Sequence, residues 1–395
     1  MKANKQNAML FLTFIFAVNF IFPKVIFSQD EDDTEFKVGG AVRYNLLLEL
    51  YEDEDITADD AQFTWDTWRL NVRGKTSGLT LDFEYRFYPT FGTHFIHHGW
   101  IGYNFSDATQ LQLGVTQVPF GDQPYASHSW WFSTSYYVGL EDDYDMGFKL
   151  THKIDNLDLA FAYFMQAEPQ GPSYGGDVNF SGPGAGRYSY DIVEVDNQSN
   201  QERNQFNARA AYTLEHGESA STEIGVSAQF GQIYNRVLDD FGSHNAVGLH
   251  LDGYYGQFNV KAHVENYTID AKDDEGNDLD LVHMGAYGFP YPIAAEASIA
   301  TVGISYSLPV SLGPISNITF YNDYSVTKKN KDEFADTQQN TIGMLVTAGS
   351  IYTYFDIASG KNQPWLTNTF GAGLGAGSED AEWNTRLNIN IGYYF

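Results

Sequence analysis

Apolar and polar residues alternate with a period of two along most of this chain. At the C-terminal end, Leu387, Ile389, Ile391, Tyr393 and Phe395 alternate with residues that are mostly polar or small. This is the pattern of a β-strand with one apolar and one polar face. The same alternation recurs at 36–51, 67–75, 79–87, 157–166, 204–214, 246–255, 257–267, 316–327 and 383–395. We predict an all-β fold of about sixteen strands.

The connections between these strands alternate in length. The acidic segment 52–64 follows the first strand, whereas only residues 76–78 follow the second. Further long segments lie at 119–144, 167–203, 271–294 and 329–337. This plan predicts a transmembrane antiparallel β-barrel with long extracellular loops and short periplasmic turns, its apolar face toward lipid and its polar face toward a lumen. Closure of the barrel requires the last strand to pair with the first.

The first 28 residues have the features of a secretory signal peptide. Lys2 and Lys5 precede an apolar run from Met9 to Phe22, and Ser28 stands at a cleavage position. The run is shorter than a membrane-spanning helix requires. We therefore predict a signal peptide at 1–28, a single barrel at 29–395, and a location in the outer membrane of a Gram-negative bacterium.

Composition narrows the class of protein further. The chain has no Cys among 395 residues, so no disulfide supports the exported fold, and its 27 Tyr and 29 Phe suit aromatic belts at membrane interfaces. A net charge of −29 argues against binding to nucleic acid. Acidic residues gather at 52–60, 141–145 and 270–280, and we expect these blocks, like the segment 167–203, to be solvated loops.

The last strand carries a first resemblance. An alternating C-terminal strand that ends in Phe resembles the outer-membrane insertion signal of bacterial barrel proteins, here Leu387, Ile389, Ile391, Tyr393 and Phe395. The resemblance implies two partners: outer-membrane lipid and the barrel-assembly machinery.

Three stretches carry a narrower resemblance. The sequences WDTWRLNVRGKTSGLTLDFEYRF (65–87), HHGWIGYNFSD (97–107) and LQLGVTQVPFG (111–121) resemble the phosphate-selective porin O and P family, with good similarity over about 36–150. The resemblance implies a sixteen-stranded porin, commonly a homotrimer, whose third long loop folds inward and narrows the pore. Residues 119–144 occupy the position of that loop. The family's anion selectivity rests on Lys and Arg that this loop lacks.

Alternation predicts which charged residues face the pore. We expect one basic sector of the wall, opposite acids on the inward loop. Such a transverse field is typical of general diffusion porins, so we predict a water-filled channel for small polar solutes or ions with a mild preference for cations. In the alternative interpretation, the arginines only form salt bridges with Asp82, Glu84 and Glu49. The candidate constriction residues are Arg43, Arg69, Arg73, Arg86 and Arg386 on the wall and Asp122, Glu141, Asp142 and Asp143 on the loop.

The same loop contains an aromatic group formed by Trp130, Trp131, Phe132, Tyr136 and Tyr137. Its rings could stack on sugars, or they could anchor the loop to the wall by apolar burial, which we favour. A phosphate- or anion-selective porin and a carbohydrate-guiding porin therefore stay open as alternatives. A plugged structural or adhesive barrel is the alternative from another class.

Metal and catalytic sites find little support. We assign His94, His97 and His98 to the second long loop and find no fourth ligand for a metal ion. The sequence DAKDDEGNDLD (270–280) resembles a calcium-binding loop, but Ala271 stands at its first ligand position. We predict no metal site, no cofactor and no catalytic residues, although loose binding of divalent ions by surface acids stays open.

Overall fold

The computed structural model describes residues 34–51, 57–173, 185–367 and 370–395. The predicted signal peptide lies outside these residues. No helix in the described part of the chain is long and apolar enough to cross a membrane.

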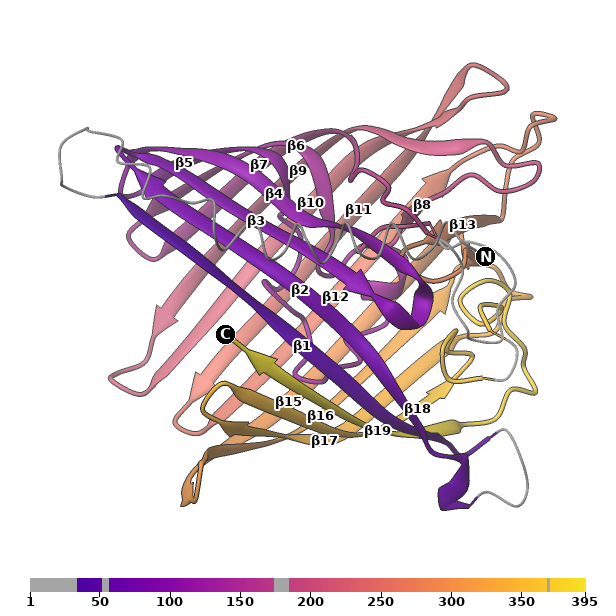
Figure 1. Cartoon of the computed structure of the whole chain (residues 1–395). Coiled ribbons are helices and arrows are strands. Elements are labelled where there is room, and N and C mark those ends of the chain that lie inside the picture. Colours follow the sequence, from indigo (N-terminus) through magenta and orange to yellow (C-terminus); the bar gives the residue numbers. More distant parts are fainter. Residues whose placement is uncertain (1–33, 52–56, 174–184, 368–369) are drawn as a thin grey trace, which may run out of the picture. The chain divides into compact units, whose positions relative to one another are not determined.

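The described residues form a closed antiparallel barrel of sixteen strands, which confirms the predicted fold class and strand number (Figure 1). Each barrel strand is hydrogen-bonded to the preceding and the following barrel strand in the sequence. The barrel strands are β1 (Glu35–Glu49), β2 (Gln62–Thr76), β3 (Leu79–Tyr88), β4 (Thr93–Ser106), β5 (Thr109–Gln117), β6 (Tyr144–Ile154), β7 (Leu157–Ala167), β9 (Asn200–Glu215), β10 (Ala220–Asn235), β11 (Asp240–Tyr255), β12 (Phe258–Asp270), β15 (Glu296–Leu312), β16 (Ile315–Lys329), β17 (Thr337–Ala348), β18 (Ile351–Lys361) and β19 (Asn384–Tyr394).

The barrel closes where β19 pairs with β1, as the sequence predicts. The N–H of Gly40 donates to the carbonyl of Phe395 at 2.9 Å, and the N–H of Phe395 donates to the carbonyl of Gly40 at 3.1 Å. A Cβ atom on Gly40 would lie 2.3 Å from the carbonyl oxygen of Arg69 and 2.9 Å from the Phe395 ring. Gly40 therefore lets the terminal Phe pack directly on the closing seam.

The two faces of the strands differ as the alternation predicts. On β19, Leu387, Ile391 and Tyr393 are exposed on the outside of the barrel, whereas Asn388 and Asn390 are buried on its inside. An apolar outer surface is what a barrel presents to lipid, and some inner polar side chains hydrogen-bond to one another, as Asn390 does with Asn45.

The two ends of the barrel also differ. Turns of two to four residues join the strands at one end, where the C-terminus lies. The connections at the other end, which we call the long-loop end, have four residues or more and include all the long segments (Figure 1). Three short 3-10 helices lie in the connections at the long-loop end: η1 (Ala58–Asp60), η2 (Pro89–Phe91) and η3 (Tyr136–Val138).

The long loops pack against one another rather than extending separately into solvent. The strands β8 (Asp191–Ile192), β13 (Leu281–Gly285) and β14 (Tyr291–Ala294) form a second sheet, which we call the cap sheet. Tyr190, Met284 and Ile293 from this region belong to a buried hydrophobic core with Tyr136. The expectation that 167–203 is a solvated loop is therefore wrong for its described residues (167–173 and 185–203), because Tyr188, Tyr190 and Ile192 pack into this core.

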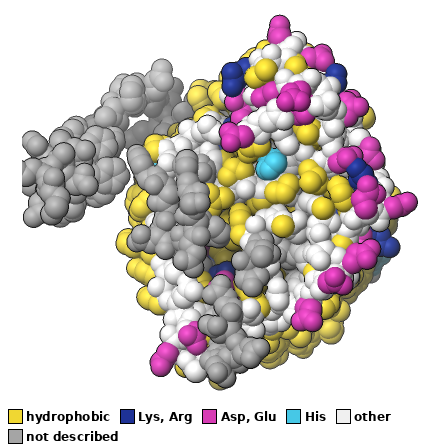
Figure 2. All heavy atoms as spheres, turned by 90° about the vertical axis from the view of Figure 1, so that its right-hand side faces the viewer, with side chains coloured by type: hydrophobic (Ala, Val, Ile, Leu, Met, Phe, Trp, Pro, Cys, Tyr) yellow, Lys and Arg dark blue, Asp and Glu magenta, His cyan; other side chains and the backbone are white. Residues whose placement is uncertain are grey.

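The surface at the long-loop end reflects this packing. Hydrophobic side chains occupy the middle of the face, and acidic side chains gather near its edge (Figure 2). Exposed acids at this end include Asp240 at the start of β11 and Asp280 and Glu333 in the loops, each within 4 Å of a Lys side chain.

The three histidines lie on a strand and not in a loop, contrary to the sequence-based expectation. The connection after β3 is the short helix η2 followed by Gly92, which has a left-handed φ of 57°. β4 then begins at Thr93 and contains His94, His97 and His98, with His97 buried. The polar histidines interrupt the apolar pattern of β4, which is why this stretch resembles a loop.

Candidate functional site

Residues 118–143, which we call the β5–β6 segment, are bound to inward-facing side chains of the barrel. On β16, the Asp323 carboxylate accepts hydrogen bonds from the backbone N–H groups of His128 and Ser129, both at 2.8 Å. The Ser325 hydroxyl accepts from the N–H of Thr134 at 3.0 Å. Polar groups of the wall thus fix the backbone in the middle of the segment.

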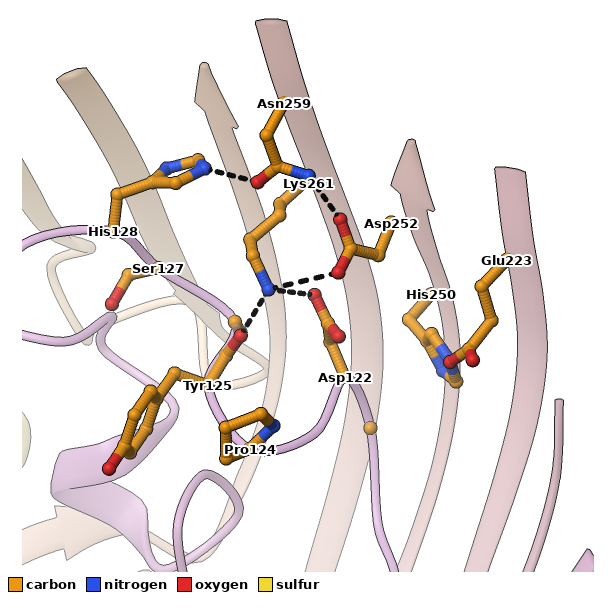
Figure 3. Close-up of polar contacts among 12 residues, drawn as sticks. Asp122, Pro124, Tyr125, Ser127, His128, Glu223, His250, Asp252, Asn259 and Lys261 are labelled. Carbon is orange, nitrogen blue, oxygen red and sulfur yellow. Dashed lines mark hydrogen bonds and ion pairs between the residues drawn. The ribbon is translucent and has the colours of Figure 1, made fainter. Parts of the chain in front are cut away.

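A buried ion pair holds the start of the segment to β12. The ammonium group of Lys261 donates to Asp122 at 2.9 Å and to the carbonyl of Tyr125 at 2.7 Å (Figure 3). It also lies 3.4 Å from the carboxylate of Asp252, which accepts a hydrogen bond from Asn259. Removing one partner of such a buried pair leaves an uncompensated charge, so we expect this contact to be costly to break.

Gly121, the last residue of the Val-Pro-Phe-Gly sequence, lies at a position that requires glycine. It has a left-handed φ of 62°, and a Cβ atom here would lie 2.6 Å from the ring of His263. Its N–H donates to the Ser227 hydroxyl at 3.0 Å, and its carbonyl accepts from Arg209 at 2.8 Å. Only Gly combines this backbone conformation with so close an approach to the wall.

The acids at 141–143 are buried and hydrogen-bonded. Glu141 accepts from the N–H of Ala126 at 2.9 Å and from the N–H and hydroxyl of Ser133 at 3.0 and 2.5 Å. Asp142 accepts from the hydroxyl of Tyr188 at 2.5 Å. Burial raises the pKa of both carboxyl groups, that of Asp142 to about 7. The expectation of a solvated acidic block at 141–145 is wrong, because these carboxyl groups serve as internal hydrogen-bond acceptors.

A cavity of about 280 Å³ lies between the β5–β6 segment and the wall formed by β1, β2, β3, β18 and β19. Arg43, Arg69, Arg86 and Arg386, four of the five predicted wall arginines, line it. Arg73 does not line it: this side chain is 65% exposed and pairs with Asp82 at 3.2 Å. The predicted acids Asp122, Glu141, Asp142 and Asp143 do not line it either.

Each of the four lining arginines has a nearby carboxylate. Arg43 lies 3.4 Å from Asp66, Arg69 lies 3.5 Å from Glu84, which also pairs with Arg86, and Arg386 lies 3.6 Å from Glu49. Salt bridges with Glu84 and Glu49 were the alternative interpretation of these arginines, and they are present. They do not bury the arginines away from the cavity, since all four still contribute to its lining.

Asp66 is a lining residue that sequence reasoning missed. Strict alternation with Trp68 and Leu70 places Asp66 on the outer face. The register between β1 and β2 shifts here, so that Arg43 faces Thr67 and Tyr44 faces Trp65. The β-bulge leaves Asp66 unpaired on the strand and turns it inward beside Arg43.

Aromatic rings of the β5–β6 segment cover the arginines. The guanidinium carbon of Arg43 lies 3.6 Å from the ring centre of Trp130, and that of Arg386 lies 5.0 Å from the ring centre of Trp131. The other predicted aromatic residues, Phe132, Tyr136 and Tyr137, also line the cavity. Phe132 stacks on Tyr136, and the hydroxyl of Tyr137 donates to the carbonyl of Trp131 at 3.0 Å.

Comparisons with known proteins agree with the fold. The chain matches no protein-family model and no curated protein sequence. It is similar in structure to OmpF of Salmonella typhi in complex with daunomycin (TM-score 0.59, 12% identity, 93% of this chain and 99% of the other). It is also similar to the outer-membrane channel DcaP of Acinetobacter baumannii (TM-score 0.57, 13% identity, 93% of this chain and 99% of the other). A third similar structure is an anion-selective porin from Comamonas acidovorans (TM-score 0.54, 12% identity, 92% of this chain and 100% of the other). The chain therefore has the fold of outer-membrane porins.

Proposed function

We propose that this protein is an outer-membrane porin that lets small polar solutes diffuse passively, with a mild preference for anions. The β5–β6 segment narrows the channel, and solutes pass along the cavity between this segment and β1, β2, β3, β18 and β19. The observation that carries the proposal is the composition of the cavity lining: among the described residues, Arg43, Arg69, Arg86 and Arg386 accompany a single carboxylate, that of Asp66.

The charge balance favours anions over cations. The expected preference for cations required the acids at 141–143 to line the constriction, and their position removes that basis. In the part of the chain that the structure describes, four guanidinium groups and one carboxylate line the cavity, although Glu84 and Glu49 offset part of the positive charge. We therefore expect a mild preference and not strict selectivity.

The exposed acids at the long-loop end, which we call the acidic rim, favour cations. The salt concentration determines whether their effect or that of the cavity arginines is larger. Asp240, Asp280 and Glu333 are exposed, so mobile ions screen them over about 8 Å at physiological salt. Charges that line a narrow, partly desolvated cavity are screened much less. The cavity should therefore determine which ion passes at moderate and high salt.

Phosphate selectivity and carbohydrate guidance are two more specific alternatives to this proposal. Phosphate selectivity follows from the resemblance to the phosphate-selective porins, and Arg pairs suit phosphate by bidentate hydrogen bonding. Carbohydrate guidance has weaker support, because the faces of Trp130 and Trp131 that a sugar would use lie against Arg43 and Arg386.

A second candidate function is a plugged structural or adhesive barrel. The observation that favours it is the hydrophobic core of Tyr136, Tyr190, Met284 and Ile293 at the long-loop end. A plugged barrel would carry no ionic current in a planar lipid bilayer, whereas a porin would give discrete conductance steps.

The proposed partners follow from the membrane location. They are outer-membrane lipid, the barrel-assembly machinery, small polar solutes and two further copies of the chain in a homotrimer. Cross-linking in intact outer membranes tests the trimer: bands of two and three chains support it, and a band of one chain contradicts it.

A matched pair of variants tests the proposed route. Arg69 and Arg73 both lie on β2, but only Arg69 lines the cavity. Arg69→Gln should shift the reversal potential of the channel in a KCl gradient toward cations, and Arg73→Gln should leave it near the wild-type value. Equal shifts for both variants would place the selective region elsewhere.

A further inference from the structure

Carboxyl groups gather where the end of the β5–β6 segment meets the cap sheet and the barrel wall. Asp143 ends the segment, Asp145 lies on β6 and Asp191 lies on β8, and all three are buried. One possible ligand oxygen from each lies within 4.8 Å of the others. Three oxygens at such spacing can share one Ca²⁺, since Ca²⁺–oxygen distances are about 2.3–2.6 Å.

Two further acids surround this group. Glu168 precedes the cap sheet and its carboxyl group approaches that of Asp191, while Glu202 on β9 accepts from the N–H of Ile192 at 2.9 Å. The nearby cation is Arg187, whose guanidinium lies 3.5 Å from Asp191. Among the described residues, five carboxyl groups thus lie near one arginine.

Some oxygens in this cluster have no N–H or hydroxyl donor. Within the described part of the chain, Asp145 Oδ1, Asp191 Oδ1 and Glu168 Oε2 accept no hydrogen bond from such a donor, although each residue is 1% exposed, and the carboxyl groups of Asp191 and Glu168 contact each other. Buried carboxylate oxygens normally accept hydrogen bonds or bind a cation, because the desolvation cost is otherwise uncompensated. Their other oxygens are engaged: Asp145 accepts from Gln205 at 2.9 Å, and Glu168 accepts from the N–H and hydroxyl of Ser189 at 3.0 and 2.8 Å.

We infer that Asp143, Asp145 and Asp191, with Glu168 beside them, form a calcium-binding site. Ca²⁺ suits it because the donors are all carboxylate oxygens, and Ca²⁺ accepts six to eight oxygens in irregular geometry. Mg²⁺ fits less well, since it demands near-octahedral geometry and keeps most of its water.

The site would connect three parts of the protein. Asp143 belongs to the β5–β6 segment, Asp145 to the barrel wall, and Asp191 with Glu168 to the loop that forms the cap sheet. Bound Ca²⁺ would therefore fix the cap sheet and the segment to the barrel.

The inference does not depend on the proposed channel function, because it concerns the binding of a cation by buried residues. Sequence inspection did not reveal it, since the four acids are spread from residue 143 to residue 191 without a motif.

Calcium titration of the detergent-solubilised, EGTA-treated protein tests the site. Isothermal titration calorimetry with CaCl₂ should show one saturable site per chain, and Ca²⁺ should raise the thermal unfolding temperature by mass action. Asp191→Asn should weaken the affinity by tenfold or more. Glu275→Gln, in the exposed acidic loop at 270–280, is the matched control and should bind as the wild type does.

Three outcomes would overturn the inference: no saturable binding to the wild type, equal affinity for Mg²⁺ and Ca²⁺, or unchanged binding by Asp191→Asn. If Asp191→Asn fails to fold, Asp145→Asn replaces it. In every case, circular dichroism of the variant must show the β-sheet signal of the wild type.

Discussion

The guanidinium group of Arg43 lies 3.6 Å from the centre of the Trp130 ring, and this contact joins the barrel wall to the β5–β6 segment across the cavity. Arg43 also donates to Asn390 and lies 3.4 Å from Asp66, so the strand that closes the barrel helps to hold it. A cation–π contact of this kind contributes about 0.5–2 kcal/mol.

Trp130 should limit the width of the cavity. Trp130→Ala removes the ring beside Arg43 and enlarges the space next to it, so we expect a higher single-channel conductance in planar bilayers. Trp383→Ala is the control, because Trp383 is 46% exposed and does not line the cavity. Unchanged conductance in Trp130→Ala would show that ions pass elsewhere.

Lys261 should hold the segment in place. Lys261→Met leaves Asp122 and Asp252 buried without their cation, which we expect to cost about 3–5 kcal/mol. Lys153→Met removes an exposed pair with Asp158, which is worth only about 0–1 kcal/mol. Urea unfolding in detergent, together with protease cleavage between 118 and 143, measures both effects. Equal stability of the two variants would contradict the assigned role of Lys261.

The terminal Phe should matter for assembly more than for stability. A charge costs about 0–1 kcal/mol near a membrane interface, so Phe395→Asp should refold in detergent almost as well as the wild type. In cells it should give less folded barrel in the outer membrane, because the last strand resembles the insertion signal of bacterial barrel proteins. Gln170→Asp, an exposed loop position, is the control. Equal barrel yields in cells would refute the assembly role.

Much of the barrel follows from the sequence because a strand with one lipid-facing side must alternate. Leu387 and Asn388 illustrate this, one exposed outside and the other buried inside. The alternation fails where the backbone departs from a regular strand: the bulge at Asp66 reverses the face of that residue.

The candidate site was harder to predict for a different reason. Four wall arginines could be assigned to one cavity because their strands are neighbours in the closed barrel. The position of Glu141 could not be predicted from the sequence, because its hydrogen bonds to Ala126 and Ser133 depend on how a long loop folds back on itself. Charge runs in sequence do not reveal whether a carboxylate is solvated or serves as an internal acceptor.

The reversal potential of the wild-type channel in a KCl gradient measures the proposed preference for anions. Because the four arginines line the cavity and the acids at 141–143 do not, we expect a reversal potential with the sign that shows chloride to be more permeant than potassium. This preference should persist at 1 M salt, where the Debye length of about 3 Å screens the exposed rim. A reversal potential that shows potassium to be more permeant at both low and high salt would contradict the proposed preference for anions. The absence of any current would contradict the proposed channel.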